Sequence, residues 1–407
     1  MTNEKKPYSS GDVSRRDFLR TSSLAVGGTV IGSLSVERGA HAASDDTIKV
    51  ALIGCGGRGT GAASQALSTE GSVRLIAMAD VFDGHLQSKL EVLQKQAKDK
   101  VDVPKDRQFI GFDAYKDAIA LADLVILTTP PGIRPIHFEE AVRQGKNIFM
   151  EKPVAVDGPG IRRVIAAAQE AKKKNLKIGV GLQRRHETPY LETIKRLHDG
   201  AIGDITSMRC YWNGSTPWVH TREDLQKQFG RPLTEMEYQF KNWYYFVWLC
   251  GDHIVEQHIH NLDVINWVKN GFPVKARGMG GCEVRKGNDY GEIFDHHSVE
   301  FEYADGSISH SMCRHQPGCW NSVSEHVVGT KGSCHVGGDR GGHTIRGENA
   351  WSFPRGTRTK NPYQQEHDDL FAAIRDDKPY NEAERGAKST LTAILGRMAT
   401  YSGKEIT

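Results

Sequence analysis

The fold of this chain is decided by Thr47-Ile48-Lys49-Val50-Ala51-Leu52-Ile53-Gly54-Cys55-Gly56-Gly57-Arg58-Gly59. The apolar run predicts a buried strand, and the turn after it has the spacing Gly-x-Gly-x-x-Gly before a helical-looking segment, residues 62–67. Gly54 allows a tight turn, Gly56 allows the backbone to approach a pyrophosphate, and Gly59 allows the helix to pack on the strand. The helix N-terminus would then face the phosphates of a dinucleotide.

A carboxylate follows at the position where a dinucleotide site needs one. A second predicted strand, residues 73–79, ends at Asp80, about 20 residues beyond the glycine turn. Asp80 can bind a ribose 2′-hydroxyl, and no arginine follows at 81 or 82 to meet a 2′-phosphate, so the sequence favours NAD over NADP. Because the chain has 43 glycines, this spacing alone could arise by chance. The strand before it, the helix after it and Asp80 make the dinucleotide-binding interpretation specific.

Strands and helices alternate outward from this turn. Further strands are predicted at 124–127, 147–150 and 176–181, separated by helices at 137–144 and 160–174. This alternation is typical of a doubly wound parallel sheet. We therefore predict an α/β protein whose N-terminal part, residues 44–182, is a Rossmann domain that binds NAD.

The pattern changes beyond residue 183. A helix at 190–199 and a strand at 205–212 precede an irregular insert, 217–250, that is rich in Trp and Tyr. Segments with period-two alternation follow at 274–283, 297–303, 307–314 and 324–329, and Ala304-Asp305-Gly306 indicates a hairpin between two of them. With closing helices at 364–375 and 382–401, residues 183–407 are predicted to be an α+β domain with a large, mostly antiparallel open sheet.

The N-terminus has the pattern of an export signal. Ser14-Arg15-Arg16-Asp17-Phe18-Leu19-Arg20 carries twin arginines, an apolar run at 24–36 follows, and Ala40-His41-Ala42 is a small-x-small cleavage site. The apolar run is too short to span a bilayer in the mature protein. We expect residues 1–43 to direct a folded protein through the twin-arginine translocase, which places it in the periplasm or elsewhere outside the cytoplasm. A disordered basic N-terminus is the alternative.

Composition narrows the class of protein. The 407 residues are enough for two domains, and a net charge of +3 without a basic block argues against nucleic-acid or anionic-membrane partners. Seven cysteines are an odd number without a Cys-x-x-Cys pair, which argues against a zinc site or a disulfide scaffold and favours buried free thiols.

A second chemistry-bearing stretch is Gly251–Asp263. If it is one helix, His253, Glu256, His260 and Asp263 share an arc of about 100°, and an apolar stripe lies apart from them. This arrangement favours an active-site wall that transfers protons over a solvated face. A metal hydrolase using the first three residues stays open, although the spacing is not His-Glu-x-x-His, and we predict no bound metal.

Four motifs in order resemble the Gfo/Idh/MocA family of NAD(P)-dependent oxidoreductases over residues 47–407: the glycine turn, the Thr-Pro turn at Thr129-Pro130, Glu151-Lys152-Pro153 and Glu256-x-x-x-His260. The resemblance implies that Lys152 lies beside the nicotinamide and the substrate hydroxyl, and that His260 accepts the proton. Glu256 stands where Asp is common in the family, so its side chain is longer. The predicted cofactor-binding residues are Gly54, Gly56, Gly57, Arg58, Gly59, Asp80, Thr129, Pro130, His137, Glu151 and Lys152.

The same chemistry follows from the residue types. Removing hydride from a carbinol requires a base for the hydroxyl proton, and an ammonium group beside that oxygen stabilises developing alkoxide charge. The predicted substrate-binding residues are Arg185, His186, Trp212, His253 and Asp263. The aromatic residues Trp212, Trp243, Tyr244, Tyr245 and Trp248 form either a sugar platform or a core or subunit-contact cluster.

These observations predict an enzyme that transfers hydride between a sugar or polyol hydroxyl and a tightly bound NAD. Little free NAD exists outside the cytoplasm, so an exported enzyme would retain its cofactor through turnover. One alternative is an NAD-dependent glycosidase acting by transient oxidation, elimination, hydration and re-reduction. Another is a non-catalytic NAD-containing sugar-binding protein. We also expect a homo-oligomer.

Overall fold

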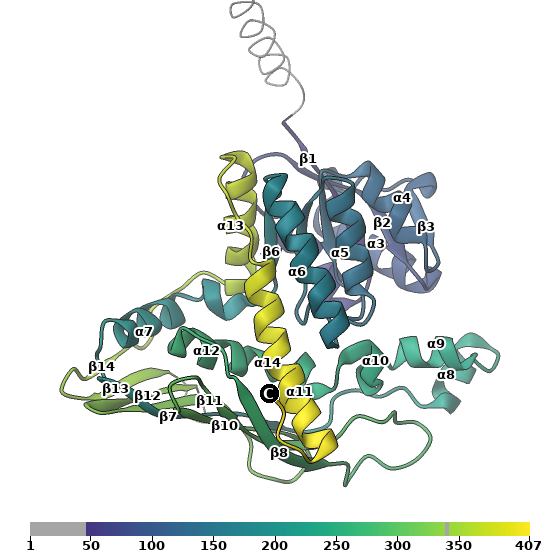
Figure 1. Ribbon diagram of the computed structural model, residues 1–407. Coiled ribbons are helices and arrows are strands. Elements are labelled where there is room, and N and C mark those ends of the chain that lie inside the picture. Colours follow the sequence, from purple (N-terminus) through teal and green to yellow (C-terminus); the bar gives the residue numbers. More distant parts are fainter. Residues whose placement is uncertain (1–45, 338–341) are drawn as a thin grey trace, which may run out of the picture. The chain divides into compact units, whose positions relative to one another are not determined.

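The first sheet of the computed structural model, which describes residues 46–337 and 342–407, is fully parallel. Its strand order is β3-β2-β1-β4-β5-β6, the order of a dinucleotide-binding doubly wound fold (Figure 1). The strands are β1 (Ile48–Ile53), β2 (Val73–Asp80), β3 (Gln108–Ile110), β4 (Leu124–Leu127), β5 (Asn147–Met150) and β6 (Ile178–Val180).

Helices cover both faces of this sheet. One apolar cluster joins it to α2, α3 and α13, and another joins its opposite face to α4, α5 and α6. The helices are α2 (Gly57–Leu67), α3 (Asp83–Gln96), α4 (Ala114–Leu121), α5 (Arg134–Arg143), α6 (Gly158–Lys173) and α13 (Pro362–Arg375). Strand and helix alternation therefore predicted the architecture correctly, but not β3, α3 and α4. The three residues of β3 are partly exposed at the sheet edge and have no apolar run to reveal them.

The second sheet is mostly antiparallel, as predicted. Its order is β14-β13-β12-β11-β7-β10-β9-β8, and only β7 and β10 pair in parallel. The predicted hairpin joins β9 to β10, with Gly306 at φ 80°. The strands are β7 (Ile205–Gly214), β8 (Lys275–Gly281), β9 (His296–Glu302), β10 (Ile308–His315), β11 (Ser322–Gly329), β12 (Gly332–Gly337), β13 (His343–Gly347) and β14 (Trp351–Ser352).

The remaining helices connect the two sheets within one compact unit, Ile48–Thr407. Figure 1 shows α14 (Ala383–Ser402) running from the side of α6 to the end of the second sheet at β8. The insert expected to be irregular contains α8 (Arg222–Phe229), α9 (Glu235–Lys241) and α10 (Val247–Cys250). Thr221 and Thr234 cap the first two of these helices, a signal that the sequence interpretation overlooked. The other helices are α7 (Thr188–His198), α11 (His253–Glu256) and α12 (Ile259–Lys269).

The remaining sequence predictions concern the N-terminal leader, the domain limits and the state of the cysteines. The twin-arginine motif and its cleavage site lie outside the described residues, and the domain limits at 43/44 and 182/183 stay predictions. In the described part of the chain, no helix combines the length and the apolar character needed to cross a membrane. All seven cysteines are free; five are buried as expected, whereas Cys282 is partly exposed and Cys319 is exposed.

Candidate active site

The glycine turn leaves room on one side and none on the other. Gly54 has a φ of 92°, and a Cβ there would lie 2.7 Å from the Thr129 nitrogen. A Cβ at Gly59 would lie 2.2 Å from the Gly54 carbonyl oxygen, so α2 can pack against the turn only through glycine. A Cβ at Gly56 or Gly57 would meet nothing within 4 Å, so the space before the N-terminus of α2 is open for a phosphate group.

Asp80 ends β2 beside this turn. Its carboxylate accepts hydrogen bonds from the Cys55 N–H at 2.6 Å and the Phe82 N–H at 2.8 Å. Both bonds fix the carboxylate at the carboxyl edge of the sheet, where open α/β folds bind ligands. The residues present therefore fit the phosphates and a ribose of a dinucleotide.

Adding one methyl group should affect stability at Gly59 but nucleotide binding at Gly56. Gly59→Ala should lower the free energy of unfolding by about 1–3 kcal/mol, because the methyl overlaps the Gly54 carbonyl. Gly56→Ala should leave the thermal unfolding of the nucleotide-free protein nearly unchanged but prevent nucleotide binding, because its methyl enters only the open space. Thermal melts and the nucleotide content of both purified variants test this pair. Full nucleotide content in Gly56→Ala would contradict the assignment of that space.

A cavity of about 250 Å³ opens at the same edge of the sheet. Lys152 reaches it from the turn after β5, Glu256 from the end of α11, and His260 from the first turn of α12. The sequence motifs thus meet at one place although they are about 100 residues apart. The lining residues are Arg58, Thr128, Thr129, Arg134, Glu151, Lys152, Gly181, Gln183, Trp243, Glu256, His260 and Tyr363.

Lys152 and Glu256 form an ion pair in the cavity wall. The Lys152 ammonium donates to Glu256 Oε1 at 3.0 Å and to the Glu256 carbonyl oxygen at 2.6 Å. The side chains are only 14% and 11% exposed. Burial raises the pKa of the Glu256 carboxyl above its usual value, and the nearby Lys152 charge opposes that shift. Glu256 Oε2 has no hydrogen-bond partner among the described residues. The longer Glu therefore holds the ammonium in place through one oxygen.

His260 is kept neutral by its surroundings. Burial lowers the pKa of the imidazole well below its usual value, and the positive charges of Lys152 and Arg184 lower it further. The Trp212 ring stacks on the imidazole, with ring centroids 5.9 Å apart. A neutral imidazole facing a cavity beside a lysine can accept a proton from a hydroxyl group there.

The prediction of one continuous helix over Gly251–Asp263 is wrong. The His258 N–H donates to the His253 carbonyl five residues back, and the His260 N–H then donates to Gln257 only three residues back. This wide turn followed by a tight turn ends α11 at Glu256 and starts α12 at Ile259. Of the four side chains spaced for one helical face, only Glu256 and His260 line the cavity.

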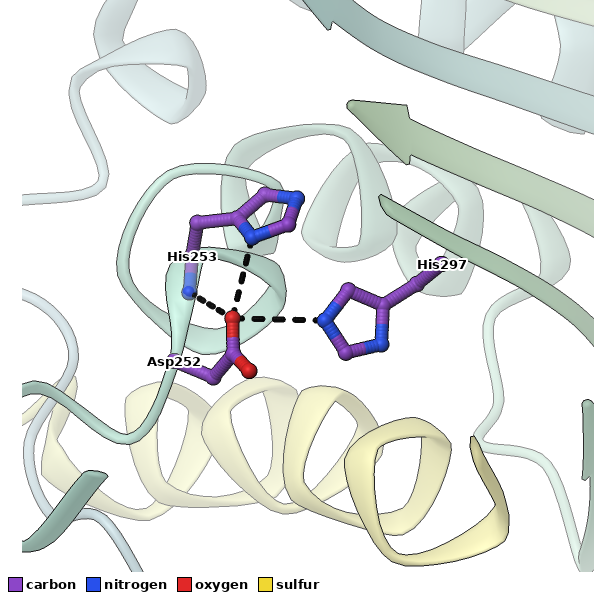
Figure 2. A group of neighbouring side chains, drawn as sticks. All are labelled: Asp252, His253 and His297. Atoms are coloured by element: carbon purple, nitrogen blue, oxygen red, sulfur yellow. Dashed lines mark hydrogen bonds and ion pairs between the residues drawn. The ribbon is translucent and has the colours of Figure 1, made fainter. Parts of the chain in front are cut away.

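His253 does not line the cavity. Figure 2 shows it beside Asp252 and His297, and its side chain is fully buried. Its Nδ1 is 2.9 Å from Asp252 Oδ1 and 3.0 Å from the Phe294 carbonyl oxygen, which can only accept, so Nδ1 carries the proton. Among the described residues, His253 groups with Asp252 and His297 as possible metal ligands, and not with Glu256 and His260. This geometry contradicts the metal-hydrolase alternative.

Two further predicted substrate residues are bound to each other. Arg185 donates from Nε and one Nη to the two carboxylate oxygens of Asp263 at 2.8 and 2.9 Å, and neither residue lines the cavity. His186 lies 2.6 Å from Asp369 and 3.5 Å from Glu382. Burial lowers the pKa of His186, but the two carboxylates raise it to about 9, so the ring is a cation held between them.

The predicted cofactor residues around the Thr-Pro turn are tied together. His137 Nδ1 is 3.1 Å from the Thr129 hydroxyl, and burial and Arg134 lower the pKa of His137 to about 3. Arg134, only 2% exposed, donates to the carbonyl oxygens of Thr129 and Pro153. It therefore joins the Pro130 turn to the Lys152 turn, a role that no sequence signal indicated.

Arg58 and Glu151 also line the cavity and contact each other. Arg58 donates to Glu151 and lies 3.3 Å from Glu366 of α13, and its guanidinium is 4.9 Å from the Tyr363 ring centroid. Glu366 is 1% exposed, and burial raises the pKa of its carboxyl. Sequence analysis missed Tyr363, because only the folded chain brings α13 to this edge. It also missed Gln183, which follows β6 and lines the cavity.

The predicted aromatic platform separates into parts. Trp243 lines the cavity, and Trp212 supports His260 from behind. Tyr244 and Tyr245 are buried in the apolar cluster of the insert, and Trp248 is 41% exposed. The core-cluster alternative is therefore correct for the two tyrosines, and one tryptophan remains as a candidate sugar contact.

Comparisons with known proteins agree with the fold. A family model described as "Oxidoreductase family, NAD-binding Rossmann fold" matches residues 48–181, and one described as "Oxidoreductase family, C-terminal alpha/beta domain" matches residues 194–399. The scyllo-inositol 2-dehydrogenase (NADP(+)) IolW of Bacillus subtilis is 27% identical over 218 residues, 53% of this chain and 52% of that protein. The match thus spans about half the length of that curated relative. The scyllo-inositol 2-dehydrogenase (NAD(+)) of the same organism is 22% identical over 320 residues, 75% of this chain and 79% of that protein.

Solved structures show the same fold at low identity. An aldose-aldose oxidoreductase from Caulobacter crescentus superposes with a TM-score of 0.68 at 18% identity, covering 89% of this chain and 99% of that one. The myo-inositol 2-dehydrogenase from Lactobacillus plantarum gives 0.63 at 20% identity, with the same coverage.

Proposed function

Because the chain belongs to the Gfo/Idh/MocA family of oxidoreductases, we propose that it transfers hydride between a sugar or polyol hydroxyl and a nicotinamide dinucleotide that it retains. The observation that carries this proposal is the meeting of Lys152, Glu256 and His260 in one cavity beside the glycine turn. Two inositol dehydrogenases among the relatives support a polyol as the substrate class. We propose NAD rather than NADP, since Asp80 suits a free ribose hydroxyl.

In this proposal the residues of the chain divide the chemistry among them. Bound nicotinamide would accept the hydride from the carbinol carbon. His260, neutral in its buried position, accepts the hydroxyl proton, and the Lys152 ammonium stabilises the negative charge that develops on that oxygen. Glu256 positions the ammonium, and Trp243 offers an aromatic face to the apolar side of a sugar ring.

The setting of the enzyme is part of the proposal. The predicted twin-arginine leader would deliver the folded protein outside the cytoplasm, where retained cofactor must return to its starting oxidation state in each cycle. Passing the hydride to a second carbonyl compound satisfies this condition. We also propose that several copies of the chain associate into a homo-oligomer.

The first experiment identifies the nucleotide. The purified protein is denatured and the released small molecules are separated; about one NAD per chain supports the proposal, and a protein that neither carries nor binds NAD or NADP refutes it. A panel of sugars and polyols is then monitored by the absorbance of bound NADH. The glycosidase alternative predicts phenol release from p-nitrophenyl glycosides without net NADH, and the binding-protein alternative predicts no reduction of bound NAD by any sugar.

A further inference from the structure

The 217–250 segment lies against the carboxyl edge of the first sheet. Its apolar cluster includes Leu225, Tyr238 and Phe240, and Val81 and Phe82 pack against that cluster. Those two residues directly follow Asp80, the carboxylate proposed to bind the adenosine ribose. The segment thus contacts the loop where the adenosine half of a dinucleotide would bind.

The same segment is attached to the two neighbouring loops. The Gly132 N–H, in the loop after β4, donates to the Leu249 carbonyl at 2.8 Å, and a Cβ at Gly132 would lie 2.0 Å from the Trp248 carbonyl oxygen. Phe112, after β3, meets Phe240 edge to face with ring centroids 5.1 Å apart. The loops that follow β2, β3 and β4 are therefore all in contact with the segment.

A polar connection runs from the segment to Asp80. The Lys241 ammonium is 2.9 Å from His85 Nε2 and can only donate, so Nε2 accepts and the ring proton sits on Nδ1. Nδ1 in turn lies 3.8 Å from Asp80 Oδ1. Lys241 is 9% exposed and lies 4.0 Å from the Phe82 ring centroid, so it is a buried cation with a defined position.

The limits of the cavity show why this matters for a cofactor. Asp80 is not among the residues that line the cavity, so a dinucleotide with its nicotinamide in the cavity and its ribose at Asp80 extends beyond the cavity. That course runs beside His85 and Lys241. Trp243, in the same segment, lines the cavity.

We propose that the 217–250 segment is a cover over the adenosine half of the cofactor, fastened by Lys241 through His85 to Asp80. The proposal rests on the proposed function and explains how the cofactor is retained. The cover must separate from the loops after β2 and β4 before the dinucleotide leaves, so its opening limits the rate of release.

The release rate tests the fastening. Lys241→Met keeps an unbranched side chain against the Phe82 and Phe229 rings but removes the ammonium, and should speed NAD release from the holoprotein about ten- to hundredfold. Lys227→Met is the matched control, because Lys227 lies on the same segment with its side chain 68% exposed; its release rate should equal that of the wild type. Released NAD is trapped by excess alcohol dehydrogenase and ethanol and followed as NADH.

Amide hydrogen exchange on the wild-type protein tests the cover without any variant. Exchange across residues 222–241 should be slower with NAD than after the nucleotide has been removed. Equal exchange in both forms, or equal release from Lys241→Met and wild type, overturns the cover and leaves the proposed function intact. A wild-type protein that binds neither NAD nor NADP refutes the proposed function itself.

Discussion

His260→Ala is expected to slow turnover by about 10²–10⁴-fold while the protein keeps its full complement of nucleotide. The imidazole is neutral and can accept a proton, because burial and the charges of Lys152 and Arg184 disfavour its protonation. Removing it leaves the hydroxyl proton without an acceptor but leaves the glycine turn untouched. His310→Ala is the control, since His310 is an exposed histidine on β10. Turnover of the His260 variant near the wild-type rate would exclude it as the base.

The pH profile provides an independent test of the same assignment. The pKa of His260 lies below the usual value of about 6.5, so the neutral, proton-accepting form persists at pH values where an ordinary histidine is already charged. The acid limb of kcat/KM should therefore fall below pH about 6.5. The same shift means that acid weakens the fold, because the unfolded chain binds this proton more readily. An acid limb above that pH would point to a different group.

The cofactor edge of the fold could be predicted from sequence because its determinants are local. The run into Gly54, the close approach at Gly59 and the carboxylate at Asp80 each follow from one residue and its immediate neighbours. Lys152 could also be placed, since the carboxyl ends of parallel strands share one edge. Its partner Glu256 was singled out by its spacing from His260 and by the family motif, but neither placed it against Lys152.

What escaped prediction depends on contacts between distant segments. Whether Gly251–Asp263 forms one helix is decided at Gln257 and His258, where the hydrogen-bond spacing changes. Of the four side chains expected on one face, only Glu256 and His260 line the cavity. Arg134 became a structural bridge only when two turns met around it. The helices of the 217–250 segment, read as irregular, are short and depend on their packing against the loops of the first sheet.

Lys152→Met is expected to reduce kcat by about 10²–10³-fold, because the charge developing on the substrate oxygen would lose its nearest cation. The same change leaves Glu256 buried without its partner. Breaking a buried ion pair typically costs about 3–5 kcal/mol of stability, so the variant should also unfold at a lower urea concentration. Activity and stability must therefore be separated.

The pH dependence and a double variant separate them. Glu256 has a raised pKa in the folded protein, so it is more easily ionised when unfolded and disfavours folding as pH rises through its folded pKa. Without Lys152 that shift grows, and Lys152→Met should lose more stability toward pH about 8 than the wild type does. Adding Glu256→Gln removes the unpaired charge and should restore much of the stability without restoring turnover. If the double variant regained turnover with its stability, Lys152 would only support the fold, and the oxygen of the substrate would need another cation.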